Sequence, residues 1–182
     1  MEKDSDSNLV MKCAHGDKKS FEALVERYEK PIYNIAYRVM NNGEDAMDIT
    51  QNIFMKAYQK IDTFDTSRKF FSWLYRIAVN ESINYSKLKH LTQEIGKDKE
   101  FAGKSPNPEE SCAESEIHGY LQDAIEALDF KYKTAIVLKH FHGLSYKEMS
   151  DILEIPEKTV KSRLFTGRQL LKNILIERGY AK

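Results

Sequence analysis

Cysteines and long apolar stretches are scarce in this chain of 182 residues. Its two cysteines, Cys13 and Cys112, are about a hundred residues apart and form no CxxC pair. That usage excludes a disulfide framework and is typical of a reducing compartment. No apolar run approaches the roughly 20 residues of a membrane-spanning helix. The first residues, MEKDSDSNLVMKC, include no apolar signal-peptide stretch. We therefore expect a cytoplasmic protein that does not itself insert into a membrane.

Signatures of catalysis and of metal binding are also missing. His140 and His142 are two residues apart, and His15 follows Cys13 by two, but neither pair has the further ligands of a zinc site. There is no phosphate-binding glycine loop, no nucleophile motif and no pair of carboxylates that suggests a catalytic cleft. We expect no catalytic residue, no metal and no cofactor, and hence a protein that is not an enzyme.

Net charge is absent overall, because 28 basic residues balance 28 acidic ones. The distribution along the chain is nevertheless uneven. Residues 68–89 hold five basic residues and one acid, and residues 158–182 hold seven and one. Residues 92–118 hold three basic residues and seven acids. Two basic patches separated by an acidic connector favour a nucleic-acid partner.

Hydrophobic periodicity predicts helices throughout the chain and strands nowhere. Apolar residues recur at helical spacing over 21–40, 44–61 and 69–88, and again from about Glu116 onward. Pro31 marks either a kink or a break in the first of these. Residues 92–115 lack periodicity and contain two glycines and two prolines, which is typical of a linker.

These patterns predict an all-α protein with two small helical domains joined by a flexible acidic linker. We place the first domain at 17–90, the linker at 91–117 and the second domain at 118–178, and expect the second to be a helix-turn-helix.

The helix-turn-helix is predicted from residue spacing alone. Ser145 and Glu148 form a capping box that starts a helix, and Pro156 stands near the start of the next. Val160 and Leu164 are spaced to face inward, which leaves a polar and basic face for the major groove. The alternative is a helical hairpin with a solvated basic face. The residues expected to point out or half out are Lys158, Thr159, Lys161, Ser162, Phe165 and Thr166.

Two segments of this sequence resemble the extracytoplasmic-function (ECF) sigma factors of RNA polymerase, of the sigma-70 family. DAMDITQNIFMKAYQKI and FDTSRKFFSWLYRIAVNESINYSK are similar to region 2, and LSYKEMSDILEIPEKTVKSRLFTGRQLL is similar to region 4. The resemblance implies a protein that binds core RNA polymerase, recognises the −10 and −35 elements of promoter DNA and helps to melt the duplex. It also implies an anti-sigma factor as a further partner, and catalysis by the polymerase alone.

The resemblance implies core-polymerase contacts at Asp45, Asp48, Gln51 and Phe54. The alternative is that the acids compensate the helix dipole and Phe54 belongs to the core. Met47 and Asn52 stand where the family often has acids.

For the −10 element, the resemblance implies a base-capturing loop around 64–69 and a promoter-facing helix after it. Aromatic faces can replace the base stacking that is lost when a duplex opens, although the spacing of Phe70 and Trp73 favours the core for those two. Asn80 is expected either to bond a base or phosphate or to be simply solvated. The implied contacts are Phe64, Arg68, Lys69, Arg76, Asn80, Asn84 and Lys87.

For the −35 element, the resemblance points to Lys161, Ser162, Phe165 and Thr166, with Arg163 and Arg168 near phosphates and Lys158 and Thr159 on the same helix. Thr166 stands where the family often has a basic residue, and Gly167 lowers helix propensity. The acidic linker resembles the family's connector toward the polymerase active channel, or it is a plain tether. Two rival interpretations are a helix-turn-helix regulator that acts alone and a helical adaptor without a nucleic-acid role.

Overall fold

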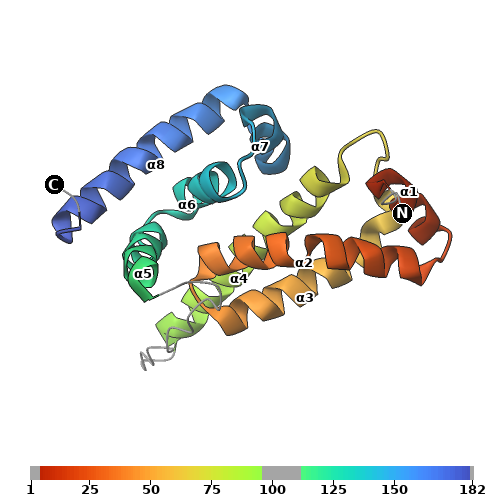
Figure 1. The fold of residues 1–182 in the computed structure, drawn as a ribbon, viewed down its shortest axis with the longest axis horizontal. Coiled ribbons are helices and arrows are strands. Elements are labelled where there is room, and N and C mark those ends of the chain that lie inside the picture. The colour runs from red at the N-terminus through yellow and green to blue at the C-terminus, as the bar shows by residue number, and fades with distance from the viewer. Residues whose placement is uncertain (1–4, 96–111, 181–182) are drawn as a thin grey trace.

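A computed structural model describes residues 5–95 and 112–180, and in these ranges the chain is helical without any strand. The helices form two groups, which confirms the all-α, two-domain prediction (Figure 1). The first group is α1 (Asp6–Ala14), α2 (Lys18–Met40), α3 (Gly43–Lys60), a short 3-10 turn (Ile61–Thr63) and α4 (Phe70–Ile95). The second is α5 (Cys112–Glu126), α6 (Phe130–Ile136) with a π-helical turn (Val137–Phe141), α7 (Tyr146–Leu153) and α8 (Glu157–Glu177).

Helix α1 was not predicted from the sequence, since its nine residues are too few for a clear periodicity. Ser5 caps it by accepting a hydrogen bond from the Asn8 amide. Asp6 then ties it to α2 through an ion pair with Arg27 and a hydrogen bond from the Tyr28 hydroxyl. Burial and the Asp6 bond raise the pKa of Tyr28. Helix α1 therefore packs with the first group although it precedes residue 17.

Pro31 lies inside α2, which continues from Lys18 to Met40. The helix ends instead at Asn41, whose backbone is left-handed with φ 52°. Asn42 then caps α3 by accepting a hydrogen bond from the Asp45 amide at 3.0 Å. The sequence left open a kink or a break at Pro31, and the prediction of a break is therefore wrong.

Helices extend into both ends of the segment predicted to be a linker, residues 91–117. Helix α4 continues to Ile95, and α5 already begins at Cys112. Good helix formers such as Gln93 and Glu94 sustain a helix without apolar periodicity, which is why the pattern missed these turns. The rest of the expected linker, 96–111, lies outside the described residues.

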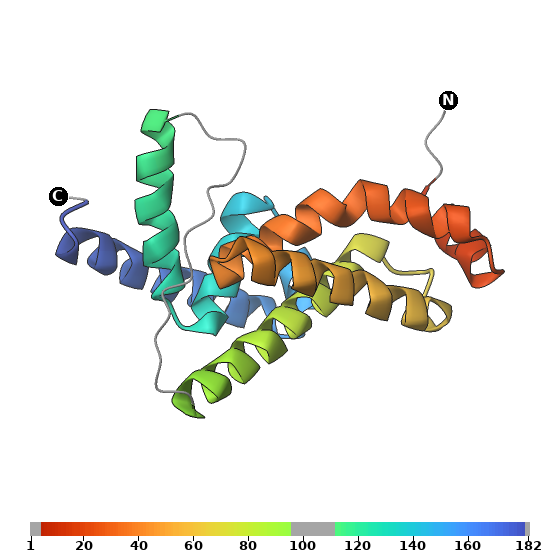
Figure 2. The ribbon, with the colours of Figure 1, turned by 90° about the horizontal axis from the view of Figure 1, so that it is seen from below.

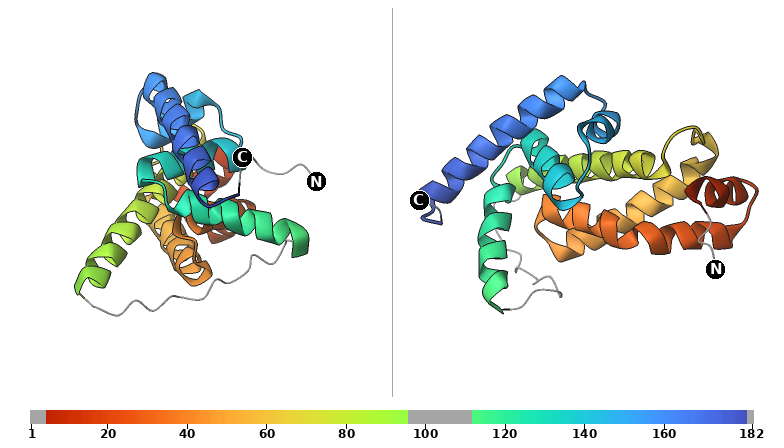
Figure 3. Two further views of the ribbon diagram at one scale, coloured as in Figure 1. Left: turned by 90° about the vertical axis from the view of Figure 1, so that its left-hand side faces the viewer. Right: turned by 45° about the horizontal axis from the view of Figure 1, so that its top comes forward.

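The two groups share one continuous apolar cluster. Helix α6 lies between α8 and α2, and α7 contacts α4 (Figures 1 and 3). Helix α5 crosses α8 steeply where the two meet (Figure 2). The seam includes polar bonds. Buried Gln122 donates to the Arg38 carbonyl at 3.0 Å and accepts from the Arg38 guanidinium at 3.1 Å. The domains therefore meet through a packed interface.

His142 lies half-buried in this seam, with its Nε2 atom enclosed. Its ring meets Tyr75 of α4 edge to face at 5.5 Å between centroids, and its Nδ1 lies 3.5 Å from the Tyr75 hydroxyl. Burial, with a contribution from the charge of Arg38, lowers the pKa of His142 to about 4. The imidazole is therefore neutral at pH 7, and the closed seam disfavours its protonation.

This burial predicts a pH-dependent stability. The His142 pKa is about 4 in the folded chain and about 6.5 when unfolded. The contribution of the neutral His142 ring to the free energy of unfolding is thus complete above pH 6.5, and it is lost as pH falls toward 4. Between pH 7 and pH 5 the free energy of unfolding should drop by about 2 kcal/mol through this group.

Urea unfolding followed by circular dichroism at both pH values measures the effect. His142→Phe keeps an aromatic ring that cannot be protonated. The variant should therefore lack the part of the drop in unfolding free energy that comes from His142. The same change at exposed His15 should not. An equal loss in wild type and His142→Phe would contradict the assignment.

Candidate nucleic-acid interface

The turn between α7 and α8 has the local geometry predicted for a helix-turn-helix. Ser145 Oγ accepts from the Glu148 amide at 3.2 Å, and Glu148 Oε2 accepts from the Ser145 amide at 3.0 Å, so the capping box is confirmed. The bond from the Ser145 amide lowers the pKa of Glu148 to about 2, together with the bonds that its carboxylate accepts from Lys69 and the Ser145 hydroxyl. Helix α7 ends at Glu154, which is left-handed with φ 53°, and α8 follows after Pro156.

Helix α8 is held against the domain by a buried stripe. Val160 and Leu164 are buried, as their spacing predicted. Gly167 continues the stripe, and a Cβ there would lie 3.3 Å from Tyr132 Cβ and 3.4 Å from Ile136 Cγ1. The glycine therefore allows α8 to approach α6 closely. This packing outweighs its low helix propensity.

The −35 candidates lie on α8 outside its buried stripe. Phe165 is 67 % exposed, although it is a large apolar side chain. Lys161 Nζ lies 5.4 Å from the centre of the Tyr146 ring, and Arg168 Nε donates to His140 Nε2 at 3.3 Å. The structure thus brings all eight candidates together on one helix. Lys158, Lys161, Ser162, Phe165 and Arg168 are exposed, whereas Thr159, Arg163 and Thr166 are half-buried.

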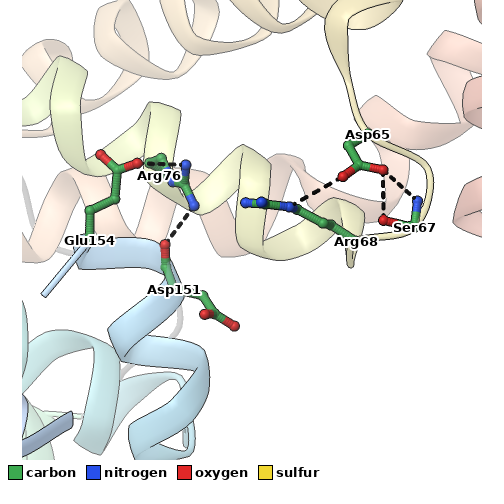
Figure 4. A network of polar contacts seen from close by, with 6 residues as sticks. All are labelled: Asp65, Ser67, Arg68, Arg76, Asp151 and Glu154. Atoms are coloured by element: carbon green, nitrogen blue, oxygen red, sulfur yellow. Dashed lines mark hydrogen bonds and ion pairs between the residues drawn. The ribbon is translucent and has the colours of Figure 1, made fainter. Parts of the chain in front are cut away.

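The −10 candidates follow the loop before α4 and then α4 itself. Asp65 orders the loop, since it accepts from the Ser67 amide and hydroxyl and pairs with Arg68 Nε at 3.3 Å (Figure 4). The Ser67 bonds lower the pKa of Asp65. Asn80 and Asn84 share one side of α4. Arg68, Lys69, Asn80, Asn84 and Lys87 are exposed, Arg76 is half-buried and Phe64 is buried.

Phe64 belongs to an aromatic cluster under the loop. Its ring centre lies 5.6 Å from that of Phe70 and 5.3 Å from that of Trp73, and Phe70 lies 5.6 Å from Trp73. Phe70 is buried and Trp73 is partly buried, in line with the core interpretation of these two residues. The cluster therefore supports the loop from below, and the loop's charged residues face outward.

Two cations of this surface contact the second group of helices, which the sequence analysis did not foresee. Arg76 donates to Glu154 Oε1 at 2.8 Å and to the Asp151 carbonyl at 2.7 Å (Figure 4). Lys69 Nζ pairs with Glu148 Oε1 at 3.0 Å. No sequence signal could reveal these partners, because they are 75 or more residues apart.

The candidates for polymerase binding on α3 differ in their surroundings. Asp45 accepts from the Tyr85 hydroxyl at 2.7 Å and pairs with Lys89, and the Asp45 bond raises the pKa of Tyr85 to about 12. Phe54 is 9 % exposed. Asp48 and Gln51, in contrast, are exposed.

Two methionines on α3 extend this exposed surface. Met47 and Met55 are 56 % and 57 % exposed, and each is four residues from Gln51. We call Met47, Asp48, Gln51 and Met55 the α3 face. The sequence analysis noted Met47 but missed Met55, because an isolated methionine gives no periodic signal.

The described residues offer neither a metal site nor a membrane-spanning helix. They contain no group of three or more His, Cys, Asp or Glu side chains placed to hold a metal ion. None of the helices described is long and apolar enough to cross a membrane.

Comparisons with known proteins identify relatives over most of the chain. Residues 24–90 match the family model of sigma-70 region 2, and residues 118–171 match that of sigma-70 region 4. The chain is 37 % identical to the ECF RNA polymerase sigma factor SigW of Bacillus subtilis, over 91 % of this chain and 94 % of that protein. It is 33 % identical to the ECF RNA polymerase sigma-E factor of Escherichia coli K12, over 93 % of each chain.

Solved structures share the fold. CnrH, in complex with the cytosolic domain of CnrY, superposes with a TM-score of 0.73 at 24 % identity, over 96 % of this chain and 99 % of that one. RpoE from Bartonella quintana, in complex with the anti-sigma factor NepR, superposes with a TM-score of 0.68 at 24 % identity, over 86 % and 97 %.

The different surroundings of the two α3 acids predict different effects on stability. Asp45→Ala removes the partner of Tyr85 and Lys89, and should lower the free energy of unfolding by about 1 to 2 kcal/mol. Asp48→Ala, on the exposed side of the same helix, should change it by less than about 0.5 kcal/mol. Chemical denaturation of both variants measures the contrast, and equal losses would contradict it.

Proposed function

This chain belongs to the ECF sigma factors of RNA polymerase, within the sigma-70 family, and we propose how its exposed surfaces divide the work of that family. As a member it binds core RNA polymerase and directs promoter-specific initiation of transcription. The observation that carries this conclusion is the match of regions 2 and 4, in that order, in a chain whose relatives align over more than 90 % of its length. We assign catalysis to the polymerase and the site of action to the cytoplasm, where transcription takes place.

The α3 face is the proposed docking surface for core polymerase. Asp48 and Gln51 supply polar contacts, and Met47 and Met55 supply apolar area beside them. Methionine side chains adapt readily to a partner surface. Asp45 and Phe54 take a supporting role in this proposal, since one is bonded within the domain and the other is buried.

The loop before α4 and the exposed side of α4 are the proposed −10 reader. Phe64 anchors the loop, and Arg68 and Lys69 offer cations to the displaced strand. Asn80, Asn84 and Lys87 recur every three to four residues along α4, so they can follow one groove or strand. Arg76 joins this surface once its contacts to α7 are released.

Helix α8 is the proposed −35 reader. Its buried stripe fixes the helix angle, and its exposed side offers hydrogen-bond donors and cations to base edges and phosphates. The proposed domains remain 17–90 and 118–178 with a linker at 91–117, and α1 adds to the first.

A protein that holds the factor inactive is the second proposed partner. Two solved structures of the same fold hold a partner protein: CnrH is in complex with the cytosolic domain of CnrY, and the sigma factor RpoE is in complex with the anti-sigma factor NepR. We propose an anti-sigma factor for this chain as well, acting on the surfaces that bind polymerase or promoter.

Polymerase binding should depend on the α3 face. Asp48→Arg combined with Gln51→Ala should weaken holoenzyme formation and leave the fold intact, because exposed substitutions usually cost little stability. Binding to core polymerase by fluorescence anisotropy measures the effect. Glu29→Arg, an equal charge reversal at an exposed site on α2, is the control and should bind normally. Unchanged affinity of the double variant would remove the assignment of the α3 face.

Promoter selection should depend on the start of α8. Lys161→Ala with Ser162→Ala should impair transcription from promoters that need the −35 element, while core binding is retained. A lost base contact costs about 1–3 kcal/mol at one base pair, whereas a lost phosphate contact weakens all sequences alike. Lys172→Ala, exposed near the far end of α8, serves as the control.

The outcome distinguishes the roles of the two side chains. Loss confined to one base pair identifies readout, and uniform loss identifies phosphate anchoring. Full transcription by the double variant would show that α8 is not the −35 reader.

A further inference from the structure

A row of side chains along α6 and its π-helical turn meets α8. Tyr132, Ile136 and His140 recur every four positions along this row. The first two lie against Gly167, where a Cβ would come within 3.3 Å of Tyr132 Cβ and 3.4 Å of Ile136 Cγ1. Arg168 follows Gly167 and meets the third, because its Nε donates to His140 Nε2 at 3.3 Å. The close approach of the two helices at Gly167 therefore places both partners of this hydrogen bond.

This bond holds the Arg168 guanidinium by one edge. An arginine side chain donates through Nε and through its two terminal nitrogens, and His140 takes the Nε–H. The terminal nitrogens lie outside this bond, and such a fork matches the oxygens of a phosphate. A side chain that is already ordered loses less conformational entropy when it binds a partner. The bond to His140 thus prepares Arg168 for an anion.

Arg168 lies on the same side of α8 as Lys161. The two residues are seven positions apart, which is about two helical turns. Both are exposed, and each is supported by a helix packed beside α8. Lys161 Nζ lies 5.4 Å from the centre of the Tyr146 ring of α7, and His140 supports Arg168. Two neighbouring helices therefore steady the cations of the side of α8 proposed for the −35 element.

The bond requires a neutral His140 ring. Arginine donates and cannot accept, so the lone pair belongs to Nε2 and the ring proton to Nδ1. A protonated ring has no lone pair for Arg168 and would add a second positive charge beside it. Burial lowers the pKa of His140 below its ordinary value, and the charges of Arg168 on α8 and Lys139 on the same turn lower it further. The accepting form is therefore the main one at pH 7.

The bond contributes little to the stability of the domain. His140 and Arg168 are both exposed, and polar contacts of charged side chains at the surface are weak because water competes for both partners. Substitutions of His140 should accordingly leave the fold intact. The main consequence of the contact is the orientation of Arg168.

We propose that His140 is a positioning residue of the −35 reader, which holds the Arg168 guanidinium so that its terminal nitrogens meet a backbone phosphate of the promoter. Protonation of His140 removes the acceptor and releases Arg168, so acid weakens this contact to DNA. The proposal rests on the −35 role proposed above for α8, whereas the bond between the two side chains does not.

Nuclear magnetic resonance of the imidazole nitrogens in the full chain tests the bond itself. At pH 8 the proton of His140 should reside mainly on Nδ1 in wild type, because Nε2 accepts from Arg168. Arg168→Ala should weaken that preference and raise the pKa of His140, since it removes both the donor and a nearby positive charge. A wild-type ring with its proton on Nε2, or no change in Arg168→Ala, would overturn the contact.

Binding of holoenzyme to a labelled promoter duplex at pH 8 tests the positioning. His140→Phe keeps a ring without an acceptor, and should weaken binding about two- to tenfold, the range that ordering one long side chain costs. His140→Gln keeps an acceptor and should bind like wild type. His15→Phe makes the same change at an exposed histidine of the first group of helices and is the control. On a duplex that ends downstream of the −35 element, all these variants should bind alike.

The effect of His140 should pass through Arg168. Arg168→Ala should weaken binding and lower the salt slope by about one unit, as the loss of a phosphate contact does. His140→Phe should then cost nothing further in the Arg168→Ala background. Equal losses for His140→Phe and His140→Gln, or a loss from His140→Phe that persists without Arg168, would overturn the positioning role.

The pH profile separates positioning from a purely structural role. The affinity of wild type relative to His140→Gln should fall as pH decreases, with the midpoint at which magnetic resonance shows His140 to be half protonated. The ratio cancels His142, which both proteins share. A constant ratio across that midpoint would overturn the proposal. Unchanged promoter binding by Arg168→Ala would instead remove Arg168 from the proposed −35 reader, while the bond seen by magnetic resonance would stand.

Discussion

The packing of α6 between α8 and α2 is the constraint on which the arrangement of this sigma factor depends. Gly167 lets α8 approach α6 so closely that a Cβ there would lie 3.3 Å from Tyr132 Cβ, and the apolar cluster then continues into the first group of helices. One short helix thereby sets both the angle of α8 and the position of the helix-turn-helix domain against α4.

The acidic and basic side chains have different roles in this architecture. The chain is neutral as a whole, but its cations gather on the surfaces proposed for promoter DNA, and its acids serve several structural purposes. Glu148 closes a capping box and also meets Lys69, and Asp45 holds Tyr85 and Lys89 within the first domain. An acid in a family motif can therefore stabilise the domain, while its exposed neighbours form the proposed docking surface.

The candidate site was predictable where it depended on local spacing. The capping box, the buried pair Val160 and Leu164 and the outward basic side of α8 followed from positions three or four residues apart. Local rules also placed Phe70 in the core. They failed for α1, which is too short to show a period, and for the ends of α4 and α5, where helix propensity continues beyond the apolar pattern.

By itself, the sequence determined the helical class, the two domains, the helix-turn-helix and the family, because periodicity, caps and motifs are properties of neighbouring residues. Only the tertiary structure decided which candidate side chains are available. It buried Phe64 against Phe70 and Trp73, bonded Asp45 internally and brought Arg76 to Glu154. It also explained Gly167, whose missing side chain matters only once α6 lies beside it. Contacts between residues 75 or more positions apart depend on how whole helices pack, and no local pattern encodes that packing.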